Sequence, residues 1–395
     1  MLVYADNAAT TKMSRTAVEA MLPYLDEIYG NPSSLHTAGQ RSSAAIQGAH
    51  STVAELLHAD AKEIIFTSGG SEADNQAILS AAAWGAKCGK KHVISTAFEH
   101  HAVLHTLRKL ERDGYDVTLL PVHENGIVTA EEVAAAIRDD TCLVSVMFVN
   151  NEIGTIQPIE EIGAVCRARG VLFHTDAVQA AGKIPVDLKD WNVDYATFSC
   201  HKIYGPKGVG ALYARRGVLL TSLIEGGAQE RGKRAGTENV PGIVATAAAL
   251  RESCDHISET SPRLIRLRNK LIDGLQAIPH AALNGDAVQR LPGNVNFCFE
   301  GIEGESLLLL LDQKGIEASS GSACTSGALD PSHVLLAIGR PHEVAHGSLR
   351  LSLSCYTTEE EVDYMLREIP PVVEYLRSMS PVWKDMERGV KPHLL

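Results

Sequence analysis

The feature of this sequence that most limits its fold is an alternation of strand and helix patterns between residues 63 and 213. Short apolar and β-branched runs, typical of buried strands, occur at Glu63–Thr67, His92–Thr96, Asp116–Leu120, Cys142–Val149, Val171–His174, Asp194–Ser199 and Val209–Tyr213. Helical periodicity separates most of them, at Ser71–Trp84, His100–Arg112, Thr129–Ile137 and Pro158–Arg169. Strands alternating with helices build βαβ units, so we predict an α/β fold with a mainly parallel sheet of seven strands.

The order of the patterns changes after Gly236. A long helical region, predicted from Gly242 to Ala277, leads into a segment in which strands and helices no longer alternate regularly. The patterns there are strand Asn294–Phe299, helix Glu305–Gln313, helix Ser332–Ile338, strand Ser348–Leu353 and helix Glu359–Ser378. This order predicts a second, smaller domain of the α+β class.

Composition and charge exclude several classes of protein. The 395 residues carry a net charge of −12 without a basic block, which argues against nucleic acid as the primary ligand. The chain contains no run of eighteen apolar residues, and its first residues lack the pattern of a signal peptide. We therefore expect a cytoplasmic protein without a membrane span. Its eight cysteines are expected to be free thiols, with Cys142, Cys166 and Cys298 packed in the core.

Polar residues follow the predicted strands, where open α/β sheets bind their ligands. Gly70 and Ser71 begin a helix, and the free N–H groups at such a start suit a phosphate. The carboxylate of Asp176, at the end of an apolar strand, needs a cation such as a protonated pyridine nitrogen. Lys202 leaves a core strand, where desolvation lowers the pKa of an amine and makes it nucleophilic. Capping explains each residue alone, but together they are the parts of a pyridoxal phosphate site.

A second unusual stretch is the small, polar loop Ser319–Asp330, which contains Cys324. A thiol in such a loop is not a core filler, and an exposed thiol that can ionise is a candidate nucleophile. The string His342–His346 matches the zincin pattern His-Glu-x-x-His. Pro341 and Gly347 leave it barely one helical turn, so we interpret it as a chance match and predict no metal site.

These residues give the chain a resemblance to cysteine desulfurases of the NifS/IscS type, within class V of the fold-type I pyridoxal phosphate enzymes. The resemblance covers the chain nearly end to end, and the pairing of Ser199–Lys202 with the Ser319–Cys324 loop is its most specific part. The matching stretches are Asp6–Thr11, Gly30–His36, Phe66–Asn75, Glu99–Leu104, Val149–Gly154, His174–Gly182, Ser199–Gly210, Arg234–Asn239, Ser319–Leu335 and Arg350.

The resemblance implies how the cofactor is held. Lys202 would bind pyridoxal phosphate as a Schiff base, Asp176 would pair with its pyridine nitrogen, and Gln179 would hydrogen-bond its phenolic oxygen. His100 would stack on its ring and assist proton transfers. The residues implied to hold the phosphate are Gly70, Ser71, Ser199, His201 and, from a neighbouring subunit, Thr237.

The resemblance also implies the reaction and the partners. Asn151 would lie beside the cofactor and the substrate, and Arg350 would grip the carboxylate of L-cysteine. Cys324 would receive the sulfur as a persulfide, leaving alanine, and would pass it to an acceptor protein for iron–sulfur cluster assembly or other biosynthesis. The expected protein is a homodimer. Its large domain would span residues 15–255, and residues 1–14 and 256–395 would form the small domain that carries the Cys324 loop.

Three other readings of the sequence stay open. Another class V enzyme, such as an aminotransferase, would not need Cys324. Selenocysteine lyase activity uses the same chemistry and is not separated by the sequence. A non-catalytic sulfur carrier or assembly scaffold would not need Lys202, Asp176 and His100.

Overall fold

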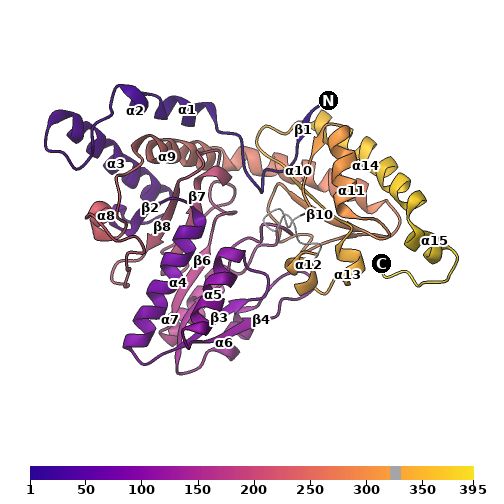
Figure 1. Cartoon of the computed structure of the whole chain (residues 1–395), viewed down its shortest axis with the longest axis horizontal. Helices are drawn as coiled ribbons and strands as arrows, with labels where there is room; N and C mark the ends of the chain where they lie inside the picture. Colours follow the sequence, from indigo (N-terminus) through magenta and orange to yellow (C-terminus); the bar gives the residue numbers. More distant parts are fainter. Residues whose placement is uncertain (321–330) are drawn as a thin grey trace.

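A seven-stranded sheet forms the centre of the larger part of the molecule (Figure 1). The computed structural model describes residues 1–320 and 331–395. The strands run in the order β2 (Ile64–Thr67), β8 (Gly210–Ala214), β7 (Tyr195–Ser199), β6 (Leu172–Asp176), β5 (Thr141–Ser145), β3 (His92–Thr96) and β4 (Asp116–Leu120). β8 runs antiparallel to both of its neighbours, and the other pairs in this sheet are parallel. The predicted α/β class and mainly parallel seven-stranded sheet are therefore confirmed.

Helices cover both faces of this sheet because successive strand residues point to opposite sides. Ile65 of β2 packs with α4 (Gly70–Lys87) and α5 (His101–Arg112), whereas Phe66 packs on the other face. That second face is covered by α3 (Thr37–Leu56), α7 (Ile159–Arg169) and α9 (Val240–Asp255). The smaller α6 (Ala130–Ala136) packs near β4 and α7. Two apolar cores thus fix the strand ends that carry the polar residues.

A second body is built around a three-stranded antiparallel sheet in the order β12 (Ser348–Ser352), β10 (Asn294–Phe299) and β9 (Ala281–Leu283). Its helices are α10 (Ile257–Gln276), α11 (Gly304–Gln313) and α14 (Glu359–Met379). The N-terminal strand β1 (Val3–Tyr4) joins this body by pairing with β11 (Ile316–Glu317). We propose, on this pairing and the separate apolar core, that the small domain consists of residues 1–14 and 256–395 and the large domain of residues 15–255.

The helical region predicted from Gly242 to Ala277 consists of two helices, and His256 lies at the break between α9 and α10. The ring of His256 contacts the carbonyl of Glu252 at 2.8 Å, the group to which its backbone N–H would otherwise donate in a continuous helix. The N–H instead donates to Cys254. The side chain of His256 thus takes over a helical acceptor, and the chain turns toward the small domain.

The remaining elements are short. They are α1 (Arg15–Met21), α2 (Pro23–Asp26), α8 (Gln229–Gly232), α12 (His333–Ala337), α13 (His342–Ala345), α15 (Pro381–Glu387) and the 3₁₀ turns Ala61–Glu63 and Cys200–Lys202. The zincin-like string lies on α13, whose four residues form a single turn. Among the helices that the structure describes, none combines the length and apolar character needed to cross a membrane.

Candidate active site

A cavity of about 690 Å³ lies beyond the carboxyl ends of the parallel strands and contains most of the predicted site. It is bounded by the N-terminal segment around Ala8 and by Arg350 of β12 in the small domain. The predicted residues that line it are Gly70, Ser71, His100, Asn151, Asp176, Gln179, Ser199, His201, Lys202 and Arg350. Residues from both sheets and from the N-terminal segment therefore meet in one space.

Lys202 reaches this cavity from the 3₁₀ turn that follows β7. Its Nζ donates to the backbone carbonyls of Ala8 and Ala9, at 2.5 and 2.6 Å. The turn itself is held by Thr11, whose N–H and hydroxyl both donate to the carbonyl of His201. Two residues later Tyr204 adopts a φ of 62°, an unusual value for a tyrosine, and its N–H is held by the Thr11 hydroxyl. The N-terminal segment therefore positions the amine.

Asp176 lies at the end of β6, where its carboxylate is buried. Its Oδ1 accepts from the N–H of Val178 at 2.9 Å. Burial raises the pKa of Asp176 to about 6, and the backbone hydrogen bond and the charge of Lys202 counteract this. Burial and the proximity of Asp176 also raise the pKa of Asp74, which lines the same cavity. Two buried carboxylates favour a cation in the cavity, and a protonated pyridine nitrogen fits this requirement.

His100 is held as a neutral ring with a defined tautomer. Its Nδ1 accepts from the N–H of Ala102 at 3.1 Å and so caps the start of α5. Burial, followed by the charge of Lys202, lowers the pKa of His100 to about 4. Because Nδ1 is an acceptor, the proton of the neutral ring sits on Nε2. His100 therefore presents a flat, uncharged ring with one N–H donor to the cavity.

The start of α4 forms a cradle for an anion. No side chain caps this end of the helix, so its first N–H groups remain available to a ligand in the cavity. A larger residue than Gly70 would be crowded here, since a Cβ at this position would lie 3.0 Å from Val178 Cγ2 and 3.4 Å from Ser199 Cβ. The carboxylate of Glu72 accepts hydrogen bonds from the hydroxyl of Ser68 and from Nε of Arg234. This geometry fits the phosphate of the predicted cofactor.

Arg350 projects from β12 and is almost fully buried. Its Nη2 donates to Asp6 Oδ1 at 2.8 Å, and its Nη1 donates to the carbonyl of Asn151 at 3.1 Å. The guanidinium thus brings together the N-terminal segment, the loop after β5 and the small-domain sheet. A planar guanidinium in a cavity is suited to a carboxylate ligand.

Besides Asp74, the acidic residues Asp6 and Glu99 contact residues of the site and were not assigned a role from the sequence. Asp6 holds Arg350, and Glu99 is completely buried directly before His100. Burial raises the pKa of Glu99 to about 8, although its Oε1 accepts from the Thr96 hydroxyl and from the N–H of Met147. A mostly protonated Glu99 at neutral pH therefore ties β3 to the segment after β5. The position of Glu99 three residues after a strand-ending threonine was the only local signal.

One predicted site residue lies apart from the cavity, and another is not among the residues that the structure describes. Thr237 is exposed and lies in a separate groove with Tyr24 and Asn31. Cys324 lies outside the described residues.

Cys142, Cys166 and Cys298 are buried as predicted, and burial raises the pKa of these thiols to about 11, 12 and 11. None of these three is suited to act as a nucleophile.

The fold and the cavity define a class of protein. A lysine, a buried aspartate and an uncapped helix start, set at the strand ends of this sheet, are the arrangement expected of pyridoxal phosphate enzymes of fold type I. Residues 3–365 match the family model "Aminotransferase class-V", and the chain belongs to that pyridoxal phosphate-dependent family.

Curated relatives give a finer comparison. The chain is 53% identical over 386 residues to "Cysteine desulfurase IscS" of Clostridium botulinum, covering 97% of each chain. It is 54% identical over 380 residues to "Cysteine desulfurase IscS" of Methanosarcina thermophila, covering 96% of this chain and 94% of that one.

A solved structure titled "NIFS-LIKE PROTEIN" matches with a TM-score of 0.90 and 40% identity, over 95% of this chain and 100% of that one. Another, titled "SspA in complex with cysteine", matches with a TM-score of 0.80 and 37% identity, over 90% of this chain and all of that one.

Proposed function

We propose that the protein is a cysteine desulfurase that converts L-cysteine to L-alanine and leaves the sulfur as a persulfide on Cys324. The observation that carries this proposal is the meeting of Lys202, Asp176 and Arg350 in one cavity. The first two fit a pyridoxal phosphate, and the third fits the carboxylate of an amino acid. Full-length relatives named cysteine desulfurase support the choice of substrate.

Each described residue has a defined task in this reaction. Arg350 binds the substrate carboxylate, and Asn151 lies beside it. Lys202 is placed to remove the proton from Cα of the substrate, and His100 can exchange a proton through Nε2. Bound pyridoxal phosphate supplies the electron sink that stabilises the carbanion at Cα, with Asp176 keeping its ring nitrogen protonated.

Different residues are proposed to contact the phosphate and the ring of the cofactor. The start of α4, with Gly70 and Ser71, offers backbone N–H groups to the phosphate, and Ser199 and His201 line the same cavity. Gln179 also lines it and donates to the carbonyl of Ala8. We propose these residues as the cofactor contacts.

The sulfur step assigns the remaining role to Cys324. Its thiolate attacks the sulfur of the bound cysteine, so that an S–S bond forms while the Cβ–S bond of the substrate breaks. The electron pair of the broken bond stays with the carbon product, which takes up protons to become alanine. The sum is L-cysteine plus a thiol giving L-alanine plus a persulfide, without an external oxidant or reductant.

The persulfide would then pass to an acceptor. We propose an acceptor protein, either an iron–sulfur scaffold or a thiolation enzyme, in the cytoplasm. The net charge of −12 is consistent with a protein partner rather than nucleic acid, and we propose no membrane partner.

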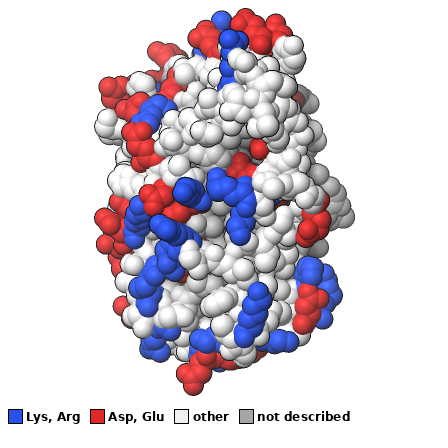
Figure 2. Space-filling model, turned by 90° about the vertical axis from the view of Figure 1, so that its left-hand side faces the viewer, with Lys and Arg blue, Asp and Glu red and all other residues white. Residues whose placement is uncertain are grey.

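We further propose a homodimer in which Thr237 completes the phosphate site of the partner. Thr237 is exposed in its own chain, and the same end of the molecule exposes Leu22, Leu25, Tyr29 and Leu35. Figure 2 shows this face, where wide uncharged areas surround a band of Lys and Arg side chains. Exposed apolar groups of this size are typical of protein interfaces.

Sedimentation measurements test the homodimer. The wild type is expected to sediment at twice the chain mass, and Tyr29→Asp with Leu35→Asp is expected to shift the protein toward monomers. Leu309→Asp serves as the control, because Leu309 is exposed and lies on α11 of the small domain, away from Tyr29 and Leu35. A monomeric wild type would contradict the proposal.

The Cys324→Ala variant tests the proposed reaction. It is expected to lose sulfur transfer from L-cysteine by at least about 100-fold, because no described cysteine lies in the cavity lining to replace the thiol. The matched control is Cys88→Ala, which removes an exposed thiol at the end of α4. Transfer to dithiothreitol, measured as sulfide and alanine, is the readout.

Two results would change the proposed function. Wild-type transfer by Cys324→Ala would remove Cys324 from the mechanism. Alanine formation only from selenocysteine, and not from cysteine, would favour the selenocysteine lyase reading that the sequence leaves open.

A further inference from the structure

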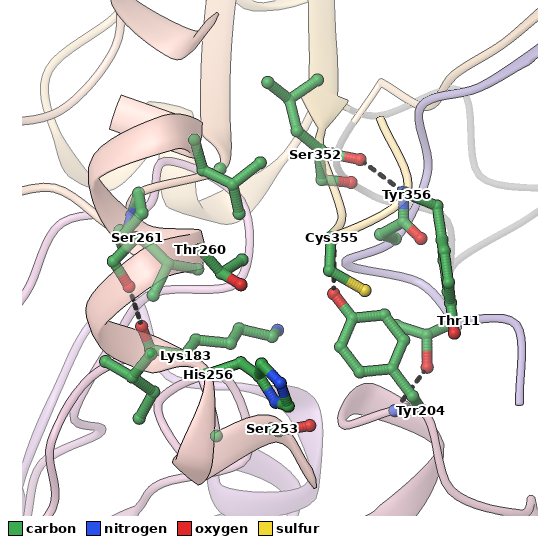
Figure 3. Close-up of a pocket in the computed structure, with 18 of the residues that line it drawn as sticks. Thr11, Lys183, Tyr204, Ser253, His256, Thr260, Ser261, Ser352, Cys355 and Tyr356 are labelled. Carbon is green, nitrogen blue, oxygen red and sulfur yellow. Dashed lines mark hydrogen bonds between the residues drawn. The ribbon is translucent and has the colours of Figure 1, made fainter. Parts of the chain in front are cut away.

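A second cavity, of about 240 Å³, adjoins the candidate active site and is shown in Figure 3. It is lined by residues of the N-terminal segment, of α9 and α10, and of the segment that follows β12. Within residues 1–320 and 331–395, Ala8 and Gln179 are the two residues that line both cavities. None of the residues proposed above to bind substrate or phosphate lines the second cavity, so the proposed reaction leaves it without a role.

Lys183 provides the main polar group of the second cavity. Figure 3 shows its side chain extending into the space between Thr260 on α10 and the segment that holds Cys355. Its Nζ donates to Gln179 Oε1 at 2.8 Å, the one hydrogen bond of this amine within residues 1–320 and 331–395. An ammonium has three N–H donors, so two remain to meet a ligand in the cavity.

The other walls are mostly apolar. Leu264, Leu291 and Leu353 are buried and face the cavity, and Ile257 lies beside them. A cavity of about 150 Å³ lined by such side chains can hold benzene, so 240 Å³ has room for about eight to ten non-hydrogen atoms. A ligand that fills it would need a short apolar body.

The charges around the cavity favour an anion at its inner end. Burial, followed by the positive charges of Lys202 and Arg350, lowers the pKa of Lys183 to about 7. Glu252 and His256 also line the cavity on its more exposed side. The Glu252 carboxylate accepts from the Thr16 hydroxyl, and its carbonyl contacts the ring of His256. Lys183 is the only Lys or Arg among the described residues that line this cavity, and the positive charges of Lys202 and Arg350 act on it from the candidate active site.

We propose that this cavity is a binding site for a small organic anion, a monocarboxylate with an apolar body of five or six carbon atoms. The carboxylate binds the amine of Lys183, and the body packs against the leucines. Occupancy is relayed to the candidate active site, because the same amine holds Gln179, whose Nε2 donates to the carbonyl of Ala8, and Lys202 donates to that same carbonyl. The relay, but not the binding site, rests on the proposed function.

Hexanoate is a suitable probe, and the neutral hexanamide has the same size and shape. In calorimetry at pH 6.5, the holoenzyme is expected to bind hexanoate at least tenfold more tightly than hexanamide. Lys183→Met is expected to remove this difference. Lys189→Met, which removes an exposed lysine on the same segment of the chain, is expected to keep it.

The pH dependence in the wild type provides a test that needs no variant. Hexanoate stays ionised between pH 6 and 9, whereas Lys183 loses its proton as the pH rises through about 7. Affinity is therefore expected to fall up to tenfold per pH unit above that range. Equal binding of hexanoate and hexanamide, or binding that does not change with pH, would overturn the proposal.

A third variant separates the two cavities. Loss of hexanoate binding in Arg350→Gln together with full binding in Lys183→Met would place the anion in the candidate active site, and the proposal would be wrong. Binding that depends on Lys183 in an enzyme without desulfurase activity would retain the new site and reject only the proposed function.

Discussion

His174 illustrates how burial sets the chemistry of single residues in this protein. It lies on β6 without solvent contact, and its two ring nitrogens contact the hydroxyls of Ser145 and Thr197. Burial lowers the pKa of His174 to about 3. The same cause keeps His100 neutral and raises the pKa of Asp176, so protonation states in the site depend on the surrounding packing.

This pKa predicts a loss of stability in acid. The unfolded chain binds a proton on His174 near pH 6.5, but the folded protein does so only near pH 3, so stability falls as the pH falls below 6.5. The free energy of unfolding is expected to decrease by about 3 kcal/mol at pH 4 from this residue alone. Urea titrations at pH 7.5 and pH 4 measure this decrease. In His174→Gln, the contribution of His174 to the decrease is expected to be absent.

The control for this prediction is His342→Gln, which replaces an exposed histidine on α13. Its pH dependence is expected to match that of the wild type. If His174→Gln lost as much stability in acid as the wild type, burial of His174 would not be the cause.

Residues at strand ends could be predicted because their position follows from the order of elements. Asp176 and Lys202 are examples, since Asp176 ends β6 and Lys202 lies in the short turn that follows β7. Asp6, Glu99 and Lys183 could not be assigned a role in this way. Asp6 pairs with Arg350 and Glu99 accepts from the N–H of Met147, both distant in sequence, and Lys183 lines a cavity that distant segments enclose.

At the scale of elements, the start of α4 is the feature that most directly shapes the site. The helix begins without a side-chain cap, and Gly70 lies so close to Val178 and Ser199 that a methyl group would crowd both. The sequence indicated this helix start from its glycines and serines. The close approach depends on the packing of α4 against β7.

Gly70→Ala therefore tests the cradle. Overpacking at such a contact costs about 1–3 kcal/mol, and because it displaces the helix start that would hold the phosphate, affinity for pyridoxal phosphate is expected to fall about 5- to 150-fold. Equilibrium dialysis of the apoprotein with the cofactor measures the change. Gly48→Ala is the matched control on α3, where a Cβ meets nothing within 4 Å and helix propensity favours alanine.

An unchanged cofactor affinity in Gly70→Ala would mean that the phosphate lies elsewhere.

The element boundaries themselves were mostly predictable from periodicity, as shown by β3, β4 and β10. The break at His256 was not, because it depends on a side chain that takes a backbone acceptor.

At the scale of the whole molecule, the N-terminal segment connects the two bodies. It adds β1 to the small-domain side, holds Lys202 through two carbonyls and lines both cavities. Sequence patterns predicted two bodies but not this connection, since β1 has only two residues and pairs with β11 more than 300 positions away. The candidate active site is therefore a product of the whole fold.

The visible absorption spectrum of the purified protein, before and after addition of L-cysteine, tests the account most directly. The account predicts an absorption band of protein-bound pyridoxal phosphate that shifts when L-cysteine is added, with alanine formed in equal amount to the sulfur transferred. Lys202→Ala is expected to lose the original band. A protein that shows no band after incubation with pyridoxal phosphate, and forms no alanine, would contradict the account.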